Sequence, residues 1–366
     1  MGVLVFVIVI VMLIVVHEFG HFVVAKWAGM RVDEFGLGYP PRAKAIGKVG
    51  ETELTLNWLP FGGFVKIYGE DGTKDGPPDL RAFGARPRIL QALVLVAGVA
   101  MNLLLAYVLI TGALIAGTPR SLAPEEIASA RNVSLGIAGV LPGSPAESAH
   151  LAPGDTIVSA TDAHGSWSAT AVPSVFTDFI SASGGEPVTL VVRHNEQEAQ
   201  VVVTPTTGIV SGDPERYALG VEVGVVGTVP LSLPAALLEG AQLTWGATVL
   251  TAVGLWHFFY GIFTLNADLS QVAGPVGIAG VVGGASAAGI GHLFAIMAII
   301  SINLALINLI PIPALDGGRL LFVVIEGILR RPISPTVTRA LNSASFALLI
   351  LLMLAVTAHD IYRIVG

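Results

Sequence analysis

The chain has 366 residues, of which 53% are hydrophobic and only 12% are charged, and its mean hydropathy is +0.76. Soluble globular proteins carry about 25% charged residues, so this composition indicates a membrane protein. The absence of cysteine excludes a disulfide framework, a thiolate metal site and a cysteine nucleophile. A net charge of −7 without a long run of Lys or Arg argues against a nucleic-acid partner.

The first apolar run covers residues 2–24, which is long enough to cross a bilayer because a span takes about 20 residues. It has no basic flank before it and no small-residue cleavage site after it, so we expect it to be retained rather than removed as a signal peptide. His17, Glu18 and His21 interrupt this run.

Three further apolar runs bring the expected number of transmembrane helices to about four. They cover about residues 89–117, 292–315 and 344–356, the last extended by 361–365.

The region between the second and third runs has a different composition, with short β-branched segments separated by turn residues. This pattern predicts a small β-rich domain over residues 120–228. The expected strands lie at 137–141, 156–160, 187–193, 199–204 and 219–226.

The distribution of basic residues predicts the orientation in the membrane, because Lys and Arg are enriched on the cytoplasmic side. Residues 26–88 carry ten of them, whereas 118–240 carry only four. We therefore expect a multi-pass protein of the inner (plasma) membrane. Both termini and the β-rich domain are then extracytoplasmic.

A fifth apolar stretch, residues 234–263, is long enough to look like another span. If it crossed the bilayer, the following run would be reversed and Asp316 would emerge outside. We therefore interpret residues 229–291 as an interfacial amphipathic linker, with aromatic residues near the headgroups. These residues are Trp245, Trp256, His257 and Tyr260.

Residues 32–68 are predicted to contain a membrane-associated β-hairpin. Alternating apolar residues at 52–58 are followed by Gly62 and Gly63 and by a second alternating segment at 64–68. A hairpin of this kind can hold an extended substrate by strand addition, with Gly63 and Phe64 as candidate substrate-binding residues.

The strongest chemical signal is the segment HEFGH at residues 17–21. Residues four apart share a helix face, so His17 and His21 can bind one metal ion, and Glu18 lies about 100° around the helix. The alternative is a chance pattern in a soluble helix. It is disfavoured because ionisable groups inside an apolar span are costly and are retained for function.

A catalytic Zn2+ usually has three protein ligands and one open position, so a third ligand must come from elsewhere. Asp316 is the best candidate, because it follows the late apolar run at the depth expected for His17. A helix cap or an interfacial turn is the alternative for Asp316.

HEFGH together with the late segment NLIPIPALDGG (308–318) resembles the site-2 protease family of intramembrane zinc metalloproteases, in particular its bacterial sigma-E-regulating branch. Segments 34–41, 59–66, 97–102 and 274–278 also resemble family motifs, although Val99 stands where the family usually has proline. In the resemblance, Asn303 and Asn308 correspond to substrate-binding positions. From the residues alone, helix–helix hydrogen bonding is an equal reading for both.

Residues 141–157 resemble a PDZ domain of the protease-associated kind. His150 occupies a position where that pattern normally has glycine, which ends a short helix in the left-handed conformation. A PDZ-like domain can bind a peptide terminus, and the resemblance also implies a size filter for substrates.

The expected fold is thus a polytopic α-helical membrane protein with one inserted extracytoplasmic PDZ-like domain. The expected domains are an N-terminal membrane core (1–119), the PDZ-like domain (120–228), the linker (229–291) and a C-terminal membrane core (292–366).

The expected function is regulated intramembrane proteolysis of single-pass membrane substrates such as anti-sigma factors. Zn2+ bound by His17, His21 and Asp316 activates water, and Glu18 acts as the general base. Two alternatives remain: a transporter or channel with an intramembrane metal site, and a catalytically inactive membrane scaffold.

Overall fold

The computed structural model describes residues 2–70, 79–117, 120–168, 171–194, 197–210, 213–229, 231–264, 274–331 and 333–365. The chain forms two compact units. The first combines Met1–Gly112 with Leu237–Gly366, and the second is Ala113–Ala236.

Four helices in the described residues are long and apolar enough to cross a membrane, as expected from the four apolar runs. They are α1 (Gly2–Trp27), α2 (Arg88–Ala116), α7 (Ile290–Leu309) and the Thr336–Tyr362 part of α9 (Pro335–Val365).

Helix α7 ends where it does because two prolines follow its last turn. Pro311 and Pro313 cannot donate backbone hydrogen bonds, so the helix ends at Leu309. Helix α8 (Asp316–Leu329) then begins almost at once. A Cβ on Gly317 or Gly318 would collide with the backbone of residues 309–313, so only glycine permits this tight reversal. The reversal makes Asp316 the first residue of α8.

One apolar core of the first unit joins α1, α2, α6 and α7, and a second joins α1, α2 and α8 to the β-sheet of residues 32–67. The first core includes Leu13 of α1 and Ile302 of α7, both fully buried. Helices α1 and α2 approach closely at Gly20, where a Cβ would collide with the carbonyl of Ala97. Small residues at such a crossing let two apolar helices pack backbone to backbone.

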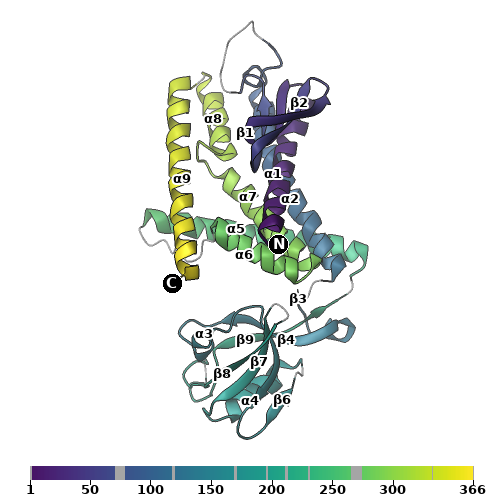
Figure 1. Cartoon of the computed structure of the whole chain (residues 1–366), viewed down its shortest axis with the longest axis vertical. Coiled ribbons are helices and arrows are strands. Elements are labelled where there is room, and N and C mark those ends of the chain that lie inside the picture. The colour runs from purple at the N-terminus through teal and green to yellow at the C-terminus, as the bar shows by residue number, and fades with distance from the viewer. Residues whose placement is uncertain are drawn as a thin grey trace. The chain divides into compact units, whose positions relative to one another are not determined.

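Helices α5 (Leu233–Phe263) and α6 (Pro275–Ala287) lie across the apolar helices rather than along them, as Figure 1 shows. The N-terminus of α6 lies against the C-terminal part of α9. The backbone N–H groups of Gly274 and Gly277 donate hydrogen bonds to the carboxylate of Asp360, at 3.2 and 2.8 Å. Residues 265–273 of the expected linker lie outside the described residues.

The predicted hairpin is a larger sheet than expected. Strand β1 (Val32–Val49) and strand β2 (Thr52–Ile67) meet at a turn at Gly50 and Glu51. A turn at Gly62–Gly63 would have paired the two halves of β2 with each other, and this prediction is wrong. Residues 34–37 of β1 lie between them: Phe35 pairs with both Leu54 and Val65.

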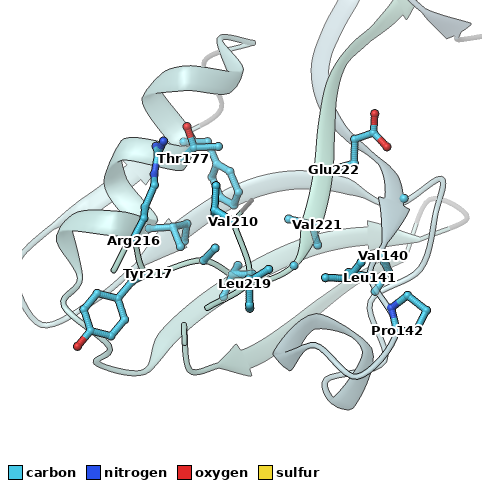
Figure 2. Close-up of a pocket in the computed structure, with 16 residues that line it drawn as sticks. Val140, Leu141, Pro142, Thr177, Val210, Arg216, Tyr217, Leu219, Val221 and Glu222 are labelled. Atoms are coloured by element: carbon cyan, nitrogen blue, oxygen red, sulfur yellow. The ribbon is translucent and has the colours of Figure 1, made fainter. Parts of the chain in front are cut away.

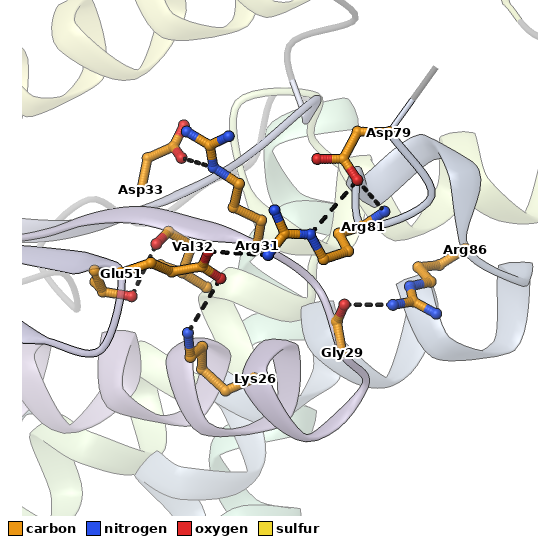
Figure 3. Close-up of polar contacts among 10 residues, drawn as sticks. Lys26, Gly29, Arg31, Val32, Asp33, Glu51, Asp79, Arg81 and Arg86 are labelled. Carbon is orange, nitrogen blue, oxygen red and sulfur yellow. Dashed lines mark hydrogen bonds and ion pairs between the residues drawn. The ribbon is translucent and has the colours of Figure 1, made fainter. Parts of the chain in front are cut away.

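A network of ion pairs joins the end of α1 to this sheet and to the segment that precedes α2 (Figure 3). Glu51 forms ion pairs with Arg81, at 2.9 Å, and with Lys26, at 3.6 Å. Arg81 also forms an ion pair with Asp79, at 3.6 Å. The guanidinium of Arg86 donates to the carbonyl of Gly29. A short 3-10 helix, Phe83–Ala85, leads from this network into α2.

The second unit is an antiparallel sheet with two short helices, α3 (Pro145–Ser148) and α4 (Pro173–Ala182), and a 3-10 turn at Ile127–Ser129. Its strand order is β3-β9-β4-β5-β7-β8, with β6 paired to β5. The strands are β3 (Arg120–Ser121), β4 (Arg131–Val140), β5 (Thr156–Thr161), β6 (Ser166–Ser168), β7 (Val188–His194), β8 (Gln197–Val203) and β9 (Val221–Thr228).

Each of the five strands expected from sequence overlaps one of these strands, because alternating apolar residues place one face in a shared core. Leu135, Ile157 and Leu190 of three adjacent strands are fully buried in that core, and Phe176 of α4 covers them. His150 adopts the left-handed conformation with φ of 58°, directly after Ala149, the C-cap of α3.

Candidate metal centre

Helix α1 places His17 and His21 on one face, one turn apart, as the spacing predicts. Both side chains are buried, with 5% and 7% of their surface exposed. The two Nε2 atoms lie 3.1 Å from each other, and the rings meet edge to face. Two imidazoles thus converge on one face of a predominantly apolar helix.

Asp316 completes the cluster from the start of α8. Its Oδ2 atom lies 2.9 Å from Nε2 of His17 and 3.2 Å from Nε2 of His21. In the part of the chain that the structure describes, this is the single group of three or more His, Asp or Glu that could share a metal ion. The structure therefore brings together the three predicted ligands.

The cluster fits a zinc ion in chemistry and in size. Two imidazoles and one carboxylate are a known ligand set for catalytic zinc. Tetrahedral zinc with bonds of about 2.0–2.1 Å holds its ligand atoms about 3.3 Å apart, close to the spacing of these three atoms.

Gly98 of α2 faces the same cluster. A Cβ at this position would collide with Nε2 of His21 and come within 2.7 Å of Cε1 of His17. The absence of a side chain at residue 98 therefore leaves room at the point where the imidazoles converge.

Neighbouring groups orient the imidazoles. Nδ1 of His21 lies 2.7 Å from the carbonyl oxygen of Val94, which can only accept a hydrogen bond. The His21 proton is therefore on Nδ1, and the lone pair of Nε2 is free for a metal. On the other ring, Nδ1 of His17 lies 3.3 Å from the side-chain amide of Asn102.

Glu18 follows His17 on α1 and is half-buried. Its Cγ would lie 3.5 Å from a Cβ built on Gly63, so the second half of β2 passes directly beside it. Phe64, the next residue, packs its ring on Gly36 across the strand pair. The structure thus brings Gly63 to Glu18, and it uses the Phe64 ring to cover the neighbouring strand.

The two predicted asparagines are placed differently. Nδ2 of Asn308 lies 3.4 Å from Nε2 of His17, at the edge of the cluster. The amide of Asn303 donates to the carbonyl of Ile299 in its own helix, at 3.0 Å. Five helical residues separate the two by about 140°, so they do not share a face.

No pattern in the sequence predicted that α2 contributes to the site, although residues 97–102 resemble a family motif. The signal that could have found it is an asparagine at the middle of an apolar span, where a polar side chain needs a partner. Asn102 is fully buried, and Gly98 lies one turn before it.

A family model described as peptidase family M50 matches residues 5–352. The chain is 34% identical over 352 residues to a protein of Clostridium perfringens whose provisional name is zinc metalloprotease, with 95% of each chain covered. It is also 29% identical to the zinc metalloprotease RasP of Geobacillus kaustophilus, over 98% of this chain and 97% of the relative.

Several apolar helices that bring two histidines and an aspartate together define the class of membrane metalloproteases. The chain belongs to peptidase family M50, the site-2 protease family, and is a zinc-dependent protease. This membership decides against the transporter and the inactive scaffold.

Proposed function

We propose that the protein is an intramembrane protease that cleaves the transmembrane segments of single-pass, membrane-anchored substrates. The observation that carries this proposal is the position of the cluster: His17 and His21 lie within an apolar helix long enough to span a membrane. Peptide hydrolysis at this place acts on bonds that lie inside or at the edge of the bilayer.

His17, His21 and Asp316 are the proposed zinc ligands. When bound, zinc supplies a Lewis acid that makes water a nucleophile near neutral pH and polarises the scissile carbonyl. Glu18 is one residue from a ligand yet points about 100° away from it, so its carboxylate is available to a proton rather than to the metal.

Glu18 acts as the general base and then as the general acid. Its carboxylate accepts a proton from the attacking water and returns it to the nitrogen of the leaving amine. The apolar residues around α1 restrict bulk water, so water must reach Glu18 through a polar path between the helices.

Strand addition to β2 is the proposed way in which substrate is held extended beside Glu18. A helical segment hides its peptide bonds in its own hydrogen bonds and must unwind before hydrolysis. Residues 63–67 pair with β1 on one side, and no other strand that the structure describes pairs with their second side. Glu18 lies beside the same segment, on the face of the strand to which a Cβ of Gly63 would point.

Side chains near the cluster complete the proposed substrate site. The amide of Asn308 is positioned to hydrogen-bond a substrate backbone group beside His17. Phe64 is proposed to support the substrate strand from β2. A contact of Asn303 with substrate requires its amide to leave the carbonyl of Ile299.

The proposed location is the inner membrane, with the basic 26–88 segment in the cytoplasm and the termini and the 120–228 domain outside. The proposed role of α5 is to lie in the membrane interface. Trp245, Trp256 and Tyr260 are 71%, 70% and 61% exposed, and their spacing places them within about 60° on one helix face. Exposed aromatics of this kind favour the headgroup region.

The second unit is proposed to be the PDZ-like domain and to bind a peptide terminus. Figure 2 shows a groove with Arg216, Tyr217 and Thr177 on one side and Val140, Leu141 and Pro142 on another. Strand β3 pairs only with Val226 and Gly227 of β9, so no described strand covers the β9 edge at residues 221–224.

A peptide strand added to this β9 edge would lie against the apolar groove floor of Phe176 and Ile180. A size filter that excludes untrimmed substrates is the other proposed role of this domain.

The experiment for the proposed function is Glu18→Gln in the full-length protein, purified in detergent. We expect zinc content to stay at the wild-type level while cleavage of a model transmembrane substrate disappears. Asp316→Ala is expected to lose zinc, and His292→Ala, outside the cluster, is expected to change neither property. Cleavage by the Glu18→Gln variant, or full zinc content in the Asp316→Ala variant, would contradict the proposal.

A further inference from the structure

Helix α2 forms a second wall of the metal centre. Val94, Gly98 and Asn102 recur every four residues and therefore lie along one stripe of α2. This stripe faces His21 and His17, which are also four apart: Val94 meets His21, Asn102 meets His17, and Gly98 lies between the two rings. Each proposed histidine ligand thus has its own partner on α2.

The Val94 carbonyl sets the tautomer of His21, as described above, and His17 needs an equivalent acceptor. If the His17 proton sat on Nε2, that atom would have no lone pair for a metal. A hydrogen-bond acceptor at Nδ1 keeps the proton away from Nε2 and also fixes the plane of the ring.

Asn102 has an acceptor to offer. Its side chain is fully buried, and its Oδ1 atom has no hydrogen-bond partner among the described residues, while Nδ2 is the atom placed 3.3 Å from Nδ1 of His17. The two ends of an amide have the same shape, so hydrogen bonding decides which end faces a partner. Turning the amide over gives Oδ1 the Nδ1–H of His17.

The position of Asn102 is itself secured from α7. The hydroxyl of Ser301 donates to the backbone carbonyl of Asn102 at 2.8 Å, and Ser301 is fully buried. The amide is therefore presented to His17 from a backbone that two helices hold in place.

We infer that Asn102 is a positioning residue for the metal centre. Its Oδ1 accepts the Nδ1–H of His17 and so holds the Nε2 lone pair of His17 towards the zinc site. This inference rests on the proposed ligand set of His17, His21 and Asp316.

The test compares three substitutions at this position in the full-length protein: Asn102→Asp keeps an acceptor oxygen, Asn102→Leu keeps the shape without one, and Asn102→Ala removes both. Zinc affinity is measured by competition with a chelator. We expect the Leu and Ala variants to bind zinc about 10–100-fold more weakly, the usual effect of losing a group that orients a ligand. The Asp variant is expected to bind within a few-fold of wild type.

A purely structural role would not produce this pattern, because it would affect the Asp and Leu variants alike. The zinc-free proteins are compared by thermal unfolding, to separate packing from ligand orientation. Wild-type zinc affinity in the Leu variant would overturn the inference, and so would an equal loss in the Asp and Leu variants.

The same measurements separate this inference from the proposed function. If the wild-type protein binds no zinc, or if Asp316→Ala retains it, the ligand set itself is wrong. If wild type binds zinc, Asp316→Ala does not, and Asn102→Leu binds as wild type does, only the role of Asn102 fails.

Discussion

Nε2 of His17 lies 2.9 Å from Oδ2 of Asp316, although 299 positions separate the two residues in the chain. The contact exists because α7 ends before two prolines and the glycines after Asp316 allow an immediate reversal into α8. The third proposed ligand therefore depends on backbone geometry at residues 310–318 as much as on the carboxylate.

Gly98→Ala is expected to weaken zinc binding by about 10-fold or more, because the new Cβ would displace the two imidazoles. Zinc affinity by chelator competition is the measurement. Gly246→Ala is the matched control, since a Cβ there meets nothing within 4 Å in helix α5. It should leave zinc affinity unchanged and add about 0.5–1 kcal/mol of stability through helix propensity. Equal zinc affinity in the Gly98→Ala variant and wild type would contradict the close approach.

Gly63→Ala is expected to slow substrate cleavage while zinc content stays at the wild-type level. A Cβ at residue 63 would lie 3.1 Å from the carbonyl of Gly36, so β1 and β2 must move apart by a few tenths of an ångström, and the new methyl group would lie 3.5 Å from Cγ of Glu18. Because a misplacement of about 1 Å beside reacting groups can cost on the order of 100-fold in rate, this smaller shift is expected to cost less than that.

The control for the Gly63→Ala variant is Gly47→Ala, in β1, where a Cβ meets nothing within 4 Å. Cleavage rates of the two variants are compared on one transmembrane substrate. An unchanged rate for the Gly63→Ala variant would remove the support for presentation of substrate on this strand.

Acid should loosen the ion-pair network at the end of α1. The hydrogen bond from Arg81 lowers the pKa of Glu51 below its ordinary 4.5, and the backbone N–H of Arg81 lowers the pKa of Asp79. Groups with a lowered folded-state pKa stabilise the fold fully above the unfolded-state pKa, and this stability is lost as the pH falls through the folded-state pKa. The loss should therefore begin near pH 4.5 and grow below it.

Hydrogen exchange of segment 79–86 between about pH 7 and pH 3.5 measures this effect, after correction for intrinsic exchange rates. Glu51→Gln is expected to flatten the pH dependence, and about 1 M salt is expected to shrink it, because these charges are exposed and screened. The same pH dependence in wild type and in the Glu51→Gln variant would show that the Glu51–Arg81 pair contributes nothing.

His150→Gly is expected to stabilise the second unit by about 0.5–1 kcal/mol. The left-handed conformation costs a residue with a Cβ about 1–2 kcal/mol, and the greater freedom of glycine in the unfolded chain offsets part of the gain. Hydrogen exchange of β4 and β5 in the full-length protein is the measurement. His164→Gly, in an exposed turn without this conformation, should be neutral or slightly destabilising. Faster exchange in the His150→Gly variant would contradict the expectation.

Features that depend on nearby residues were predictable. The i, i+4 spacing brings His17 and His21 to one helix face, and continuous apolar runs predict the four long helices. The alternation of apolar residues likewise predicts the strands around Leu135 and Ile157. Helical and strand periodicities are properties of the local backbone, so a single sequence reports them.

Other features needed the tertiary structure because they join residues that no period relates. Sequence predicted that the two halves of β2 pair with each other, but 34–37 of β1 lie between them. Strand pairing is decided by which segments can bury their backbone hydrogen bonds together, not by their order.

What the sequence by itself determined is therefore the kind of chemistry: two histidines and a glutamate on one apolar helix, with an aspartate after a late proline break. Only the tertiary structure decided the surroundings: Gly63 beside Glu18, Gly98 between the imidazoles, and Asn102 behind His17. The physical reason is that donor chemistry resides in each side chain, whereas the orientation and spacing of the donors depend on how α1, α2 and α8 pack.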